Sequence, residues 1–341
     1  MKIRSENAPA GDRSSGRFKI CGTGICLPQK VVTASELDRL IGKPDGWTAR
    51  HTGVLERRWV EGELQSELGA AAARAALQEA GLDLGAVDVL IGASGVPEQP
   101  IPCTAARILA ELDPAATEVA AYDLNATCLS FLVAFDHAAQ LIETGRANCV
   151  LVVSSEIASL GLDFSEAESA ALMGDGAAAV LLRREEDGGR VLASRMQTFP
   201  EGIAFAELKG GGTRHHPTRC TFRKEDHLFH MKGKELFRLV SQHLGRQVAA
   251  LMDAEGISWS GIKAVLAHQA SGPAVELLGN RLGIPEEKLV RIYPRCGNTI
   301  AASLPMCLHE LRQSTALESG DRVLFIGTSA GVSIASLLLE V

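Results

Sequence analysis

The sequence contains few aromatic residues and no long apolar run. Aromatic side chains make up 4% of the 341 residues and hydrophobic ones 46%, so aliphatic and small side chains must form most of the core, which favours closely packed helices and sheets. No stretch approaches the roughly 18 apolar residues that a membrane-spanning helix needs. The polar start, MKIRSENAPAGDRSSGRFKI, has no apolar segment of the kind found in secretory signals. These absences predict a cytoplasmic protein that does not enter a membrane.

Paired cysteines and an excess of positive charge are missing as well. Eight cysteines occur at irregular spacing without a CxxC pair, and a chain of this length does not depend on disulfides for its stability, so we expect reduced thiols. The net charge is −7, which argues against binding of nucleic acid through a general basic surface.

Strand-like and helix-like segments alternate along the chain, which predicts an α/β fold with helices covering parallel or mixed sheets and with function at the carboxyl ends of strands. The order of segments in residues 17–183 is repeated in 231–341, so two similar α/β halves are expected. Residues 184–230 are interpreted as a linker strand with a cap or interface loop, and 1–16 as a disordered leader. The last segment, DRVLFIGTSAGVSIASLLLEV, is predicted to form one closing strand.

Three chemically reactive or polar residues stand where a predicted strand gives way to a helix: Cys128, His268 and Asn298. Cys128 precedes a long amphipathic helix, whose unpaired N–H groups are expected to favour the thiolate and to hold an oxyanion. A thiolate can attack a thioester, an imidazole can donate or accept a proton, and an amide can donate to an enolate. Together they predict acyl transfer, although each residue taken alone is more often structural.

The segments NATCLSF, LAHQAS and CGNTIAAS follow one another as in ketoacyl-acyl-carrier-protein synthase III of the thiolase superfamily, which the chain resembles over nearly all of 17–341. WTARHTGVLERR, MGDGAAAVLL and GTSAGVSIA also match motifs of that family. The resemblance implies a duplicated five-layered αβαβα fold, a homodimer, and transfer of an acyl group from a coenzyme A or carrier-protein thioester to Cys128. His268 and Asn298 would then stabilise the enolate formed when malonyl-acyl-carrier protein loses carbon dioxide.

The same resemblance implies an oxyanion hole made by the N–H groups of Cys128 and Ala330, and no metal, nucleotide or redox cofactor. It places Trp47, His51, Ile101, Lys234 and Gln269 in the substrate site. His51 stands where the family usually has a coenzyme A-binding arginine, and Ala167, between two glutamates, stands where it has another. Weaker or altered recognition of coenzyme A is therefore expected, with a carrier-protein donor as the alternative.

Several alternatives stay open at this stage. An isoleucine at position 101, where relatives that join two acyl chains without decarboxylation carry glutamate, argues against that chemistry, although Glu98 is near. A specialised acyltransferase or condensing enzyme of a biotin-precursor or secondary-metabolite pathway, and a catalytically silent partner subunit, are the other functions to weigh. For an acidic carrier protein, Arg238 and Arg281 are the candidate contacts. A zinc site is a minor alternative, and its possible ligands are His215, His216, Cys220, His227 and His230.

Overall fold

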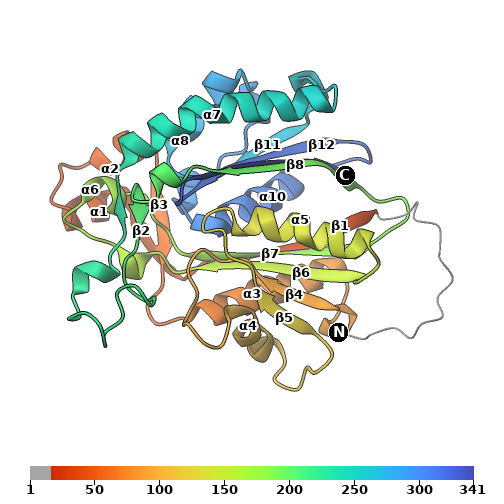
Figure 1. Cartoon of the computed structure of the whole chain (residues 1–341), viewed down its shortest axis with the longest axis horizontal. Coiled ribbons are helices and arrows are strands. Elements are labelled where there is room, and N and C mark those ends of the chain that lie inside the picture. The colour runs from red at the N-terminus through yellow and green to blue at the C-terminus, as the bar shows by residue number, and fades with distance from the viewer. Residues whose placement is uncertain (1–16) are drawn as a thin grey trace.

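Five layers of alternating helices and sheets make up the structure (Figure 1), a computed structural model that describes residues 17–341. The leader predicted at 1–16 lies outside the described residues. Helices α3 (Gln65–Ala80) and α4 (Thr104–Leu112) cover one outer face, and α7 (Gly233–Ala254) and α8 (Gly272–Leu282) cover the other. Helices α5 (Ser130–Glu143) and α10 (Ser303–Ser314) lie between the two sheets. This arrangement confirms the predicted five-layered α/β fold.

The two sheets are built from separate parts of the chain. The first has the order β1-β7-β6-β4-β5, and its strands are β1 (Phe18–Cys26), β4 (Val89–Gly92), β5 (Ala120–Asp123), β6 (Cys149–Glu156) and β7 (Gly176–Arg184). The second has the order β11-β12-β13-β8, and its strands are β8 (Arg190–Thr198), β11 (Ala264–Ala267), β12 (Arg322–Ser329) and β13 (Ser333–Glu340). Strand β8, from the segment interpreted as a linker, therefore pairs within the second sheet.

The smaller elements lie around one end of the layers (Figure 1). They are β2 (Lys30–Thr33), α1 (Ala34–Leu40), α2 (Trp47–Thr52), β3 (Glu56–Trp59), α6 (Ala167–Ala170), β9 (Ala206–Glu207), β10 (His230–Met231) and α9 (Tyr293–Cys296). Strands β2 and β3 pair with each other, as do β9 and β10.

The central layer carries the core that joins the two sheets. The ring of Phe135 on α5 lies 5.9 Å from that of Phe18 on β1 and 5.8 Å from that of Phe325 on β12, measured between centroids. This is the amphipathic helix predicted after Cys128, and its buried apolar face includes Phe131, Leu132, Phe135, Ala138, Ala139 and Ile142. The few phenylalanines thus fill the space where helices of small residues would leave gaps.

The prediction of a single closing strand is wrong, because this segment forms the antiparallel pair β12 and β13. The chain reverses at Gly331, whose φ of 124° is available to glycine but strained for other residues. The reversal leaves Ala330 at the end of β12.

Parallel pairing aligns the strand ends that carry the site. Strand β4 is parallel to β5 and β6, and β11 is parallel to β12, so the loops after these strands emerge at the same edge of each sheet. Within residues 17–341, no helix has the length and apolar character needed to cross a bilayer.

Candidate active site

The loop that carries Cys128 is fixed by hydrogen bonds just before helix α5. The Ser130 hydroxyl accepts the N–H of Ala126 at 2.9 Å and donates to the carbonyl of Thr127 at 2.7 Å. Asn125 binds the Thr127 N–H through its oxygen at 2.9 Å. Thr127 has a φ of 52°, a left-handed conformation that is costly for a β-branched residue. The hydrogen bonds hold this strained turn, which presents Cys128 at the start of the helix.

The Cys128 thiol is neutral at pH 7, which corrects the prediction of a thiolate. Its pKa is raised to about 12, chiefly by burial, and the charge of Glu156 acts in the same direction when that group is ionised. Hydrogen bonding to the main-chain groups of Cys128 and Ala330 lowers the pKa, but by less than these two effects raise it. The sequence shows the helix start but not the packing around the sulfur, so the opposing effect was not foreseen.

His268 follows strand β11 and is buried. The main-chain N–H of His268 donates to the Ile326 carbonyl at 2.8 Å, which extends the β11–β12 pairing by one residue. Its Nδ1 lies 2.8 Å from the hydroxyl of Ser303 at the start of α10. Burial lowers the pKa of His268 to about 4, so the imidazole is neutral at pH 7. With Nδ1 bound to Ser303, Nε2 is the nitrogen left for a substrate oxygen.

Asn298 is positioned by its own loop and by the chain after His268. Its side-chain oxygen accepts the N–H of Ile300 at 2.9 Å, and its Nδ2 donates to the carbonyl of Ala270 at 3.5 Å. The main-chain N–H of Asn298 donates to Leu172 at 2.8 Å. Ile300, like Thr127, has a left-handed φ, in this case 49°. A strained non-glycine residue therefore lies close to each of two predicted catalytic residues.

Contacts among the three loops place Cys128, His268 and Asn298 in one region. The backbone of β12 passes between Leu129 and His268 at Gly327. A Cβ added to Gly327 would lie 2.5 Å from a methyl group of Leu129 and 3.8 Å from the Cβ of His268. The Asn298 side chain meets Ala270, two residues after His268. These contacts bring the thiol, the neutral imidazole and the amide to one region, where the main chain of Ala330 is hydrogen-bonded to the Cys128 sulfur.

Sequence reasoning missed Glu156, the last residue of β6. Its side chain is only 1% exposed, and its Oε1 accepts the N–H groups of Gly95 at 2.6 Å and Ala301 at 3.4 Å. Burial raises its pKa to about 8. A charged residue that ends an apolar strand, in NCVLVVSSEI, was the available signal, because strand ends carry function in this kind of fold.

Replacing Glu156 by glutamine should stabilise the protein in a pH-dependent way. Below pH about 4.5 the carboxyl is protonated in the folded and unfolded chains alike. Above that, the unfolded chain releases the proton and the fold retains it up to pH about 8, so wild type loses roughly 1.4 kcal/mol per pH unit across this interval. The glutamine side chain of the variant cannot ionise, so Glu156→Gln does not lose folding stability in this way. Melting temperatures of wild type and Glu156→Gln at pH 5 and pH 8 check this prediction. A difference between the two proteins that does not grow with pH would contradict it.

Gln269 has a different role from the predicted one of binding substrate. It is fully buried, its Nε2 donates to Ala267 and Val290, and its Oε1 accepts the N–H groups of Ile292 and Tyr293. The main chain therefore uses every hydrogen-bonding position of the carboxamide. Gln269 supports the loop after His268 and has no group left for a substrate.

Trp47 and His51 lie together on α2, whose C-terminal end packs against Gly272 at the start of α8. Their rings stack with centroids 4.3 Å apart and 19° between planes, and His51 Nδ1 lies 2.8 Å from the Trp47 carbonyl. The ammonium of Lys43 lies 5.4 Å from the centre of the indole. Asp38 accepts the N–H groups of Trp47 and Thr48, which fixes the helix start.

Ile101 and Glu98 lie in the loop before α4 and differ in their surroundings. Ile101 is 83% exposed. Glu98 pairs with Arg107 and accepts the N–H of Ser66 at 2.7 Å, and these hydrogen bonds lower its pKa against the effect of burial, the largest single influence. The Glu98 carboxylate is therefore bound within the same chain and ionised.

The predicted cationic residues lie on the outer helices of the second half. Lys234 and Arg238 are exposed on α7. Arg281, in the last turn of α8, places its guanidinium 5.4 Å from the centre of the Phe237 ring, so α7 and α8 bring these charges to one side of the molecule. Glu166, beside Ala167, lies 3.0 Å from His230.

The residues of the zinc alternative do not gather into one site. His215 lies 3.8 Å from Asp226, His216 binds Thr218, and His227 packs on Phe222. Cys220 is exposed and free. Only His230 joins other possible ligands, Asp163 and Glu166, and its Nδ1 and Nε2 are hydrogen-bonded to Glu166 and to the Glu225 carbonyl.

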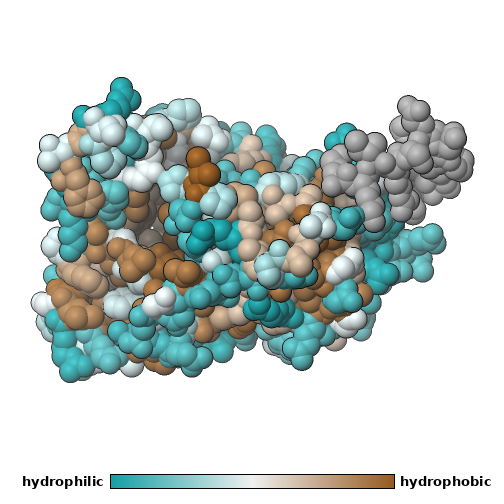
Figure 2. Space-filling model, turned by 90° about the horizontal axis from the view of Figure 1, so that it is seen from below, coloured by the Kyte–Doolittle hydropathy of each residue, from teal (hydrophilic) through white to brown (hydrophobic). Residues whose placement is uncertain are grey.

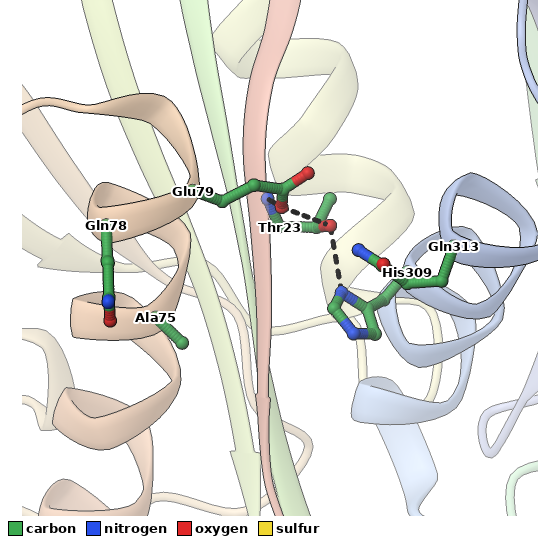
Figure 3. Close-up of a pocket in the computed structure, with 6 residues that line it drawn as sticks. All are labelled: Thr23, Ala75, Gln78, Glu79, His309 and Gln313. Atoms are coloured by element: carbon green, nitrogen blue, oxygen red, sulfur yellow. Dashed lines mark hydrogen bonds between the residues drawn. The ribbon is translucent and has the colours of Figure 1, made fainter.

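A pocket outside the three loops of the candidate site lies at β1, between α3 and α10 (Figure 3). The Thr23 hydroxyl donates to Glu79 at 3.0 Å and lies 2.9 Å from His309 Nδ1. In a nucleophilic triad the imidazole stands between hydroxyl and carboxylate, whereas here the hydroxyl stands in the middle. Arg312 also binds Glu79, so we interpret the group as a structural contact.

The layered fold and the grouped thiol, imidazole and amide define an acyl-transfer enzyme fold of the thiolase type. Residues 122–200 match the family described as 3-oxoacyl-[acyl-carrier-protein] synthase III, and residues 252–341 match its C-terminal counterpart. The β-ketoacyl-[acyl-carrier-protein] synthase III of Aquifex aeolicus is 33% identical over 322 residues, which cover 94% of this chain and 99% of that one. The chain belongs to the β-ketoacyl-acyl-carrier-protein synthase III family.

Solved structures agree with this assignment. The crystal structure of the Aquifex aeolicus synthase has a TM-score of 0.85 at 30% identity and covers 95% of this chain and 100% of its own. The synthase III from Pseudomonas aeruginosa has a TM-score of 0.85 at 27% identity, with 95% and 98% covered.

Proposed function

We propose that the protein is a decarboxylating β-ketoacyl synthase that uses Cys128 as its acyl carrier. In the first step the Cys128 sulfur attacks a primer thioester, the bond from the carbonyl to the donor sulfur breaks, and the thiol proton leaves with the donor thiol. In the second, malonyl-acyl-carrier protein loses carbon dioxide, and the resulting carbanion displaces the Cys128 sulfur as a thiolate to give a 3-oxoacyl thioester. The thiolate then takes up a proton from water, which restores the thiol. The steps balance without a metal, nucleotide or redox cofactor.

The observation that carries this proposal is the position of the Cys128 sulfur. It is hydrogen-bonded to the main-chain groups of Cys128 and Ala330, and the neutral His268 lies in the same region. Two N–H donors at the sulfur suit the oxygen of a tetrahedral intermediate. A neutral imidazole and the Asn298 amide are hydrogen-bond donors suited to an enolate oxygen. Because an enolate forms only in condensation, the amide favours this reaction over simple acyl transfer.

A carrier protein is favoured over coenzyme A as the primer donor. The indole of Trp47 is already stacked against His51, and Lys43 lies near the ring, so an adenine would have to displace a side chain to stack there. The exposed Lys234, Arg238 and Arg281 would attract an acidic carrier. In both steps a carrier protein would then bring its thioester to the same docking surface, formed by Lys234, Arg238 and Arg281.

Reversing the charge at Arg238 tests this docking surface. Arg238→Glu should raise the KM for malonyl-acyl-carrier protein about tenfold at low salt, because a rim charge steers association and is screened as salt rises. Arg246→Glu, also exposed but farther along α7, is the matched control. An equal effect of both variants, or no salt dependence, would contradict the assignment.

A homodimer completes the proposed site. Strand β5 is an edge strand of the first sheet, and edge strands invite pairing with a second chain. Ile101, exposed near this edge, would enter the acyl pocket of the partner. Figure 2 views the molecule from below, the side of α4 and β5 in Figure 1, and shows brown apolar areas and a hollow on this face. The eight free cysteines suit the proposed cytoplasmic location.

The direct test supplies malonyl-acyl-carrier protein with a series of acyl-coenzyme A and acyl-carrier-protein primers and measures products by mass spectrometry. The expected product is a 3-oxoacyl-carrier protein, formed faster from the carrier-bound primer. Acylated Cys128 without a condensation product would indicate a simple acyltransferase. No acylation by any primer would support a silent partner subunit instead.

A specialised pathway has support from one structure in particular. A priming β-ketosynthase of a polyketide biosynthetic pathway has a TM-score of 0.86 at 26% identity and covers 98% of both chains. The range of primers accepted in the same assay would separate a polyketide or biotin-precursor role from fatty-acid synthesis.

A further inference from the structure

We propose that Glu156 is a positioning residue whose buried carboxyl joins the Cys128 and Asn298 loops and whose negative charge, when present, opposes ionisation of Cys128. The inference rests on the proposed role of Cys128 as the acyl acceptor, and it assigns to the same site a residue that controls when the thiol becomes a nucleophile.

The positioning role follows from the hydrogen bonds of Glu156. Its Oε1 accepts the N–H of Gly95 at 2.6 Å and the N–H of Ala301 at 3.4 Å. The Gly95 carbonyl accepts Asn125 Nδ2 at 3.0 Å, which ties the same segment to the Cys128 loop. On the other side, Ala301 follows Ile300, whose N–H holds the Asn298 side-chain oxygen at 2.9 Å. One carboxyl group thus supports both loops.

The two strained residues meet at the same place. A Cβ on Gly95 would lie 2.7 Å from the Ile300 side chain, 3.4 Å from Glu156 Oε1 and 3.5 Å from the carbonyl carbon of Thr127. Thr127 and Ile300 are the non-glycine residues with positive φ among residues 17–341. Such conformations persist only where surrounding contacts impose them. The Glu156 carboxyl binds the Ile300 segment directly at Ala301 and supports the Thr127 segment through Gly95, which binds Asn125.

The electrostatic role follows from burial and from the neighbours of the carboxyl. The titratable groups that face Glu156 are Cys128 and Asp175, the latter just before β7. The loops after β4 and around Ala301 contribute main-chain N–H groups to it. The pKa of Glu156 is raised to about 8, first by burial, so the group is mostly neutral at pH 7. Glu156 therefore opposes the formation of a negative charge at Cys128 only at a pH where Glu156 itself is ionised.

The test measures alkylation of Cys128 by iodoacetamide between pH 6 and pH 10, read by peptide mass spectrometry, in wild type and Glu156→Gln. Glutamine keeps an oxygen for the Gly95 and Ala301 N–H groups but cannot ionise. Below pH 7 both proteins should react at the same rate, and above pH 8 the variant should react up to about tenfold faster, as expected for a thiol pKa about one unit lower.

The matched control is Asp136→Asn on α5, which also removes a carboxyl whose pKa burial raises. Its alkylation profile should follow that of wild type. Superimposable profiles of wild type and Glu156→Gln would overturn the proposal. Because alkylation needs no thioester, this outcome is distinct from failure of the proposed function, in which Cys128 reacts with iodoacetamide but with no acyl donor.

The positioning role has its own readout. Glu156→Ala leaves both N–H groups without an acceptor and should reduce kcat for condensation more than the rate of Cys128 acylation, because Asn298 acts only in condensation. Glu156→Gln should restore condensation at pH 7. A folded alanine variant with wild-type condensation would refute this role, and if alanine prevents folding, failure of glutamine to support condensation at pH 7 would refute it.

Discussion

Cys128→Ser should abolish acyl-enzyme formation and reduce condensation by at least about a thousandfold, the usual scale for loss of a covalent nucleophile. The intact mass of wild type should rise by one acyl group after exposure to the productive primer, and the mass of the variant should not change. The thiol is neutral at rest, yet sulfur is a far better nucleophile towards thioesters than a serine hydroxyl held in the same place.

Cys307→Ser is the matched control for this experiment. Cys307 is buried and free on the central helix α10, and the pKa of its thiol is raised well above normal by burial. Its variant should acquire the acyl group as wild type does. Acylation of Cys128→Ser at the wild-type rate would show that another residue accepts the acyl group.

Asn298→Ala should separate the two steps of the reaction. Loss of one hydrogen-bond donor to a developing oxyanion costs about a hundredfold to a thousandfold in rate, so condensation should fall by this factor. Acylation of Cys128 should stay within a few-fold of wild type, because the amide has no part in it. Single-turnover mass spectrometry follows acyl-enzyme formation, and release of labelled carbon dioxide from malonyl-acyl-carrier protein follows the second step.

Asn280→Ala, at an exposed position on α8, provides a control for the loss of an amide elsewhere. It should leave both rates unchanged. Equal loss of acylation and condensation in Asn298→Ala would instead indicate that the loop has collapsed or that the amide acts on the first intermediate.

The sequence was sufficient to predict the layers of the fold and the three loops of the site. The amphipathic helix after Cys128 depends on local chemistry, so it could be read directly, and α5 confirms it. The ionisation of Cys128, the commitment of Gln269 to the main chain and the place of Glu156 depend on which segments meet. Such contacts join residues far apart in the chain. The local sequence marks Glu156 as a charged residue at a strand end, but it does not show which groups surround it.

The Phe135 ring, in contact with the first sheet through Phe18 and with the second through Phe325, has a consequence for how the chain unfolds. A helix layer enclosed by two sheets exposes its apolar surface when either sheet departs, so neither half can melt without removing the support of the other. Unfolding should therefore be strongly cooperative. In evolution, a core substitution on one side of the central helices would be constrained by the packing on the other side.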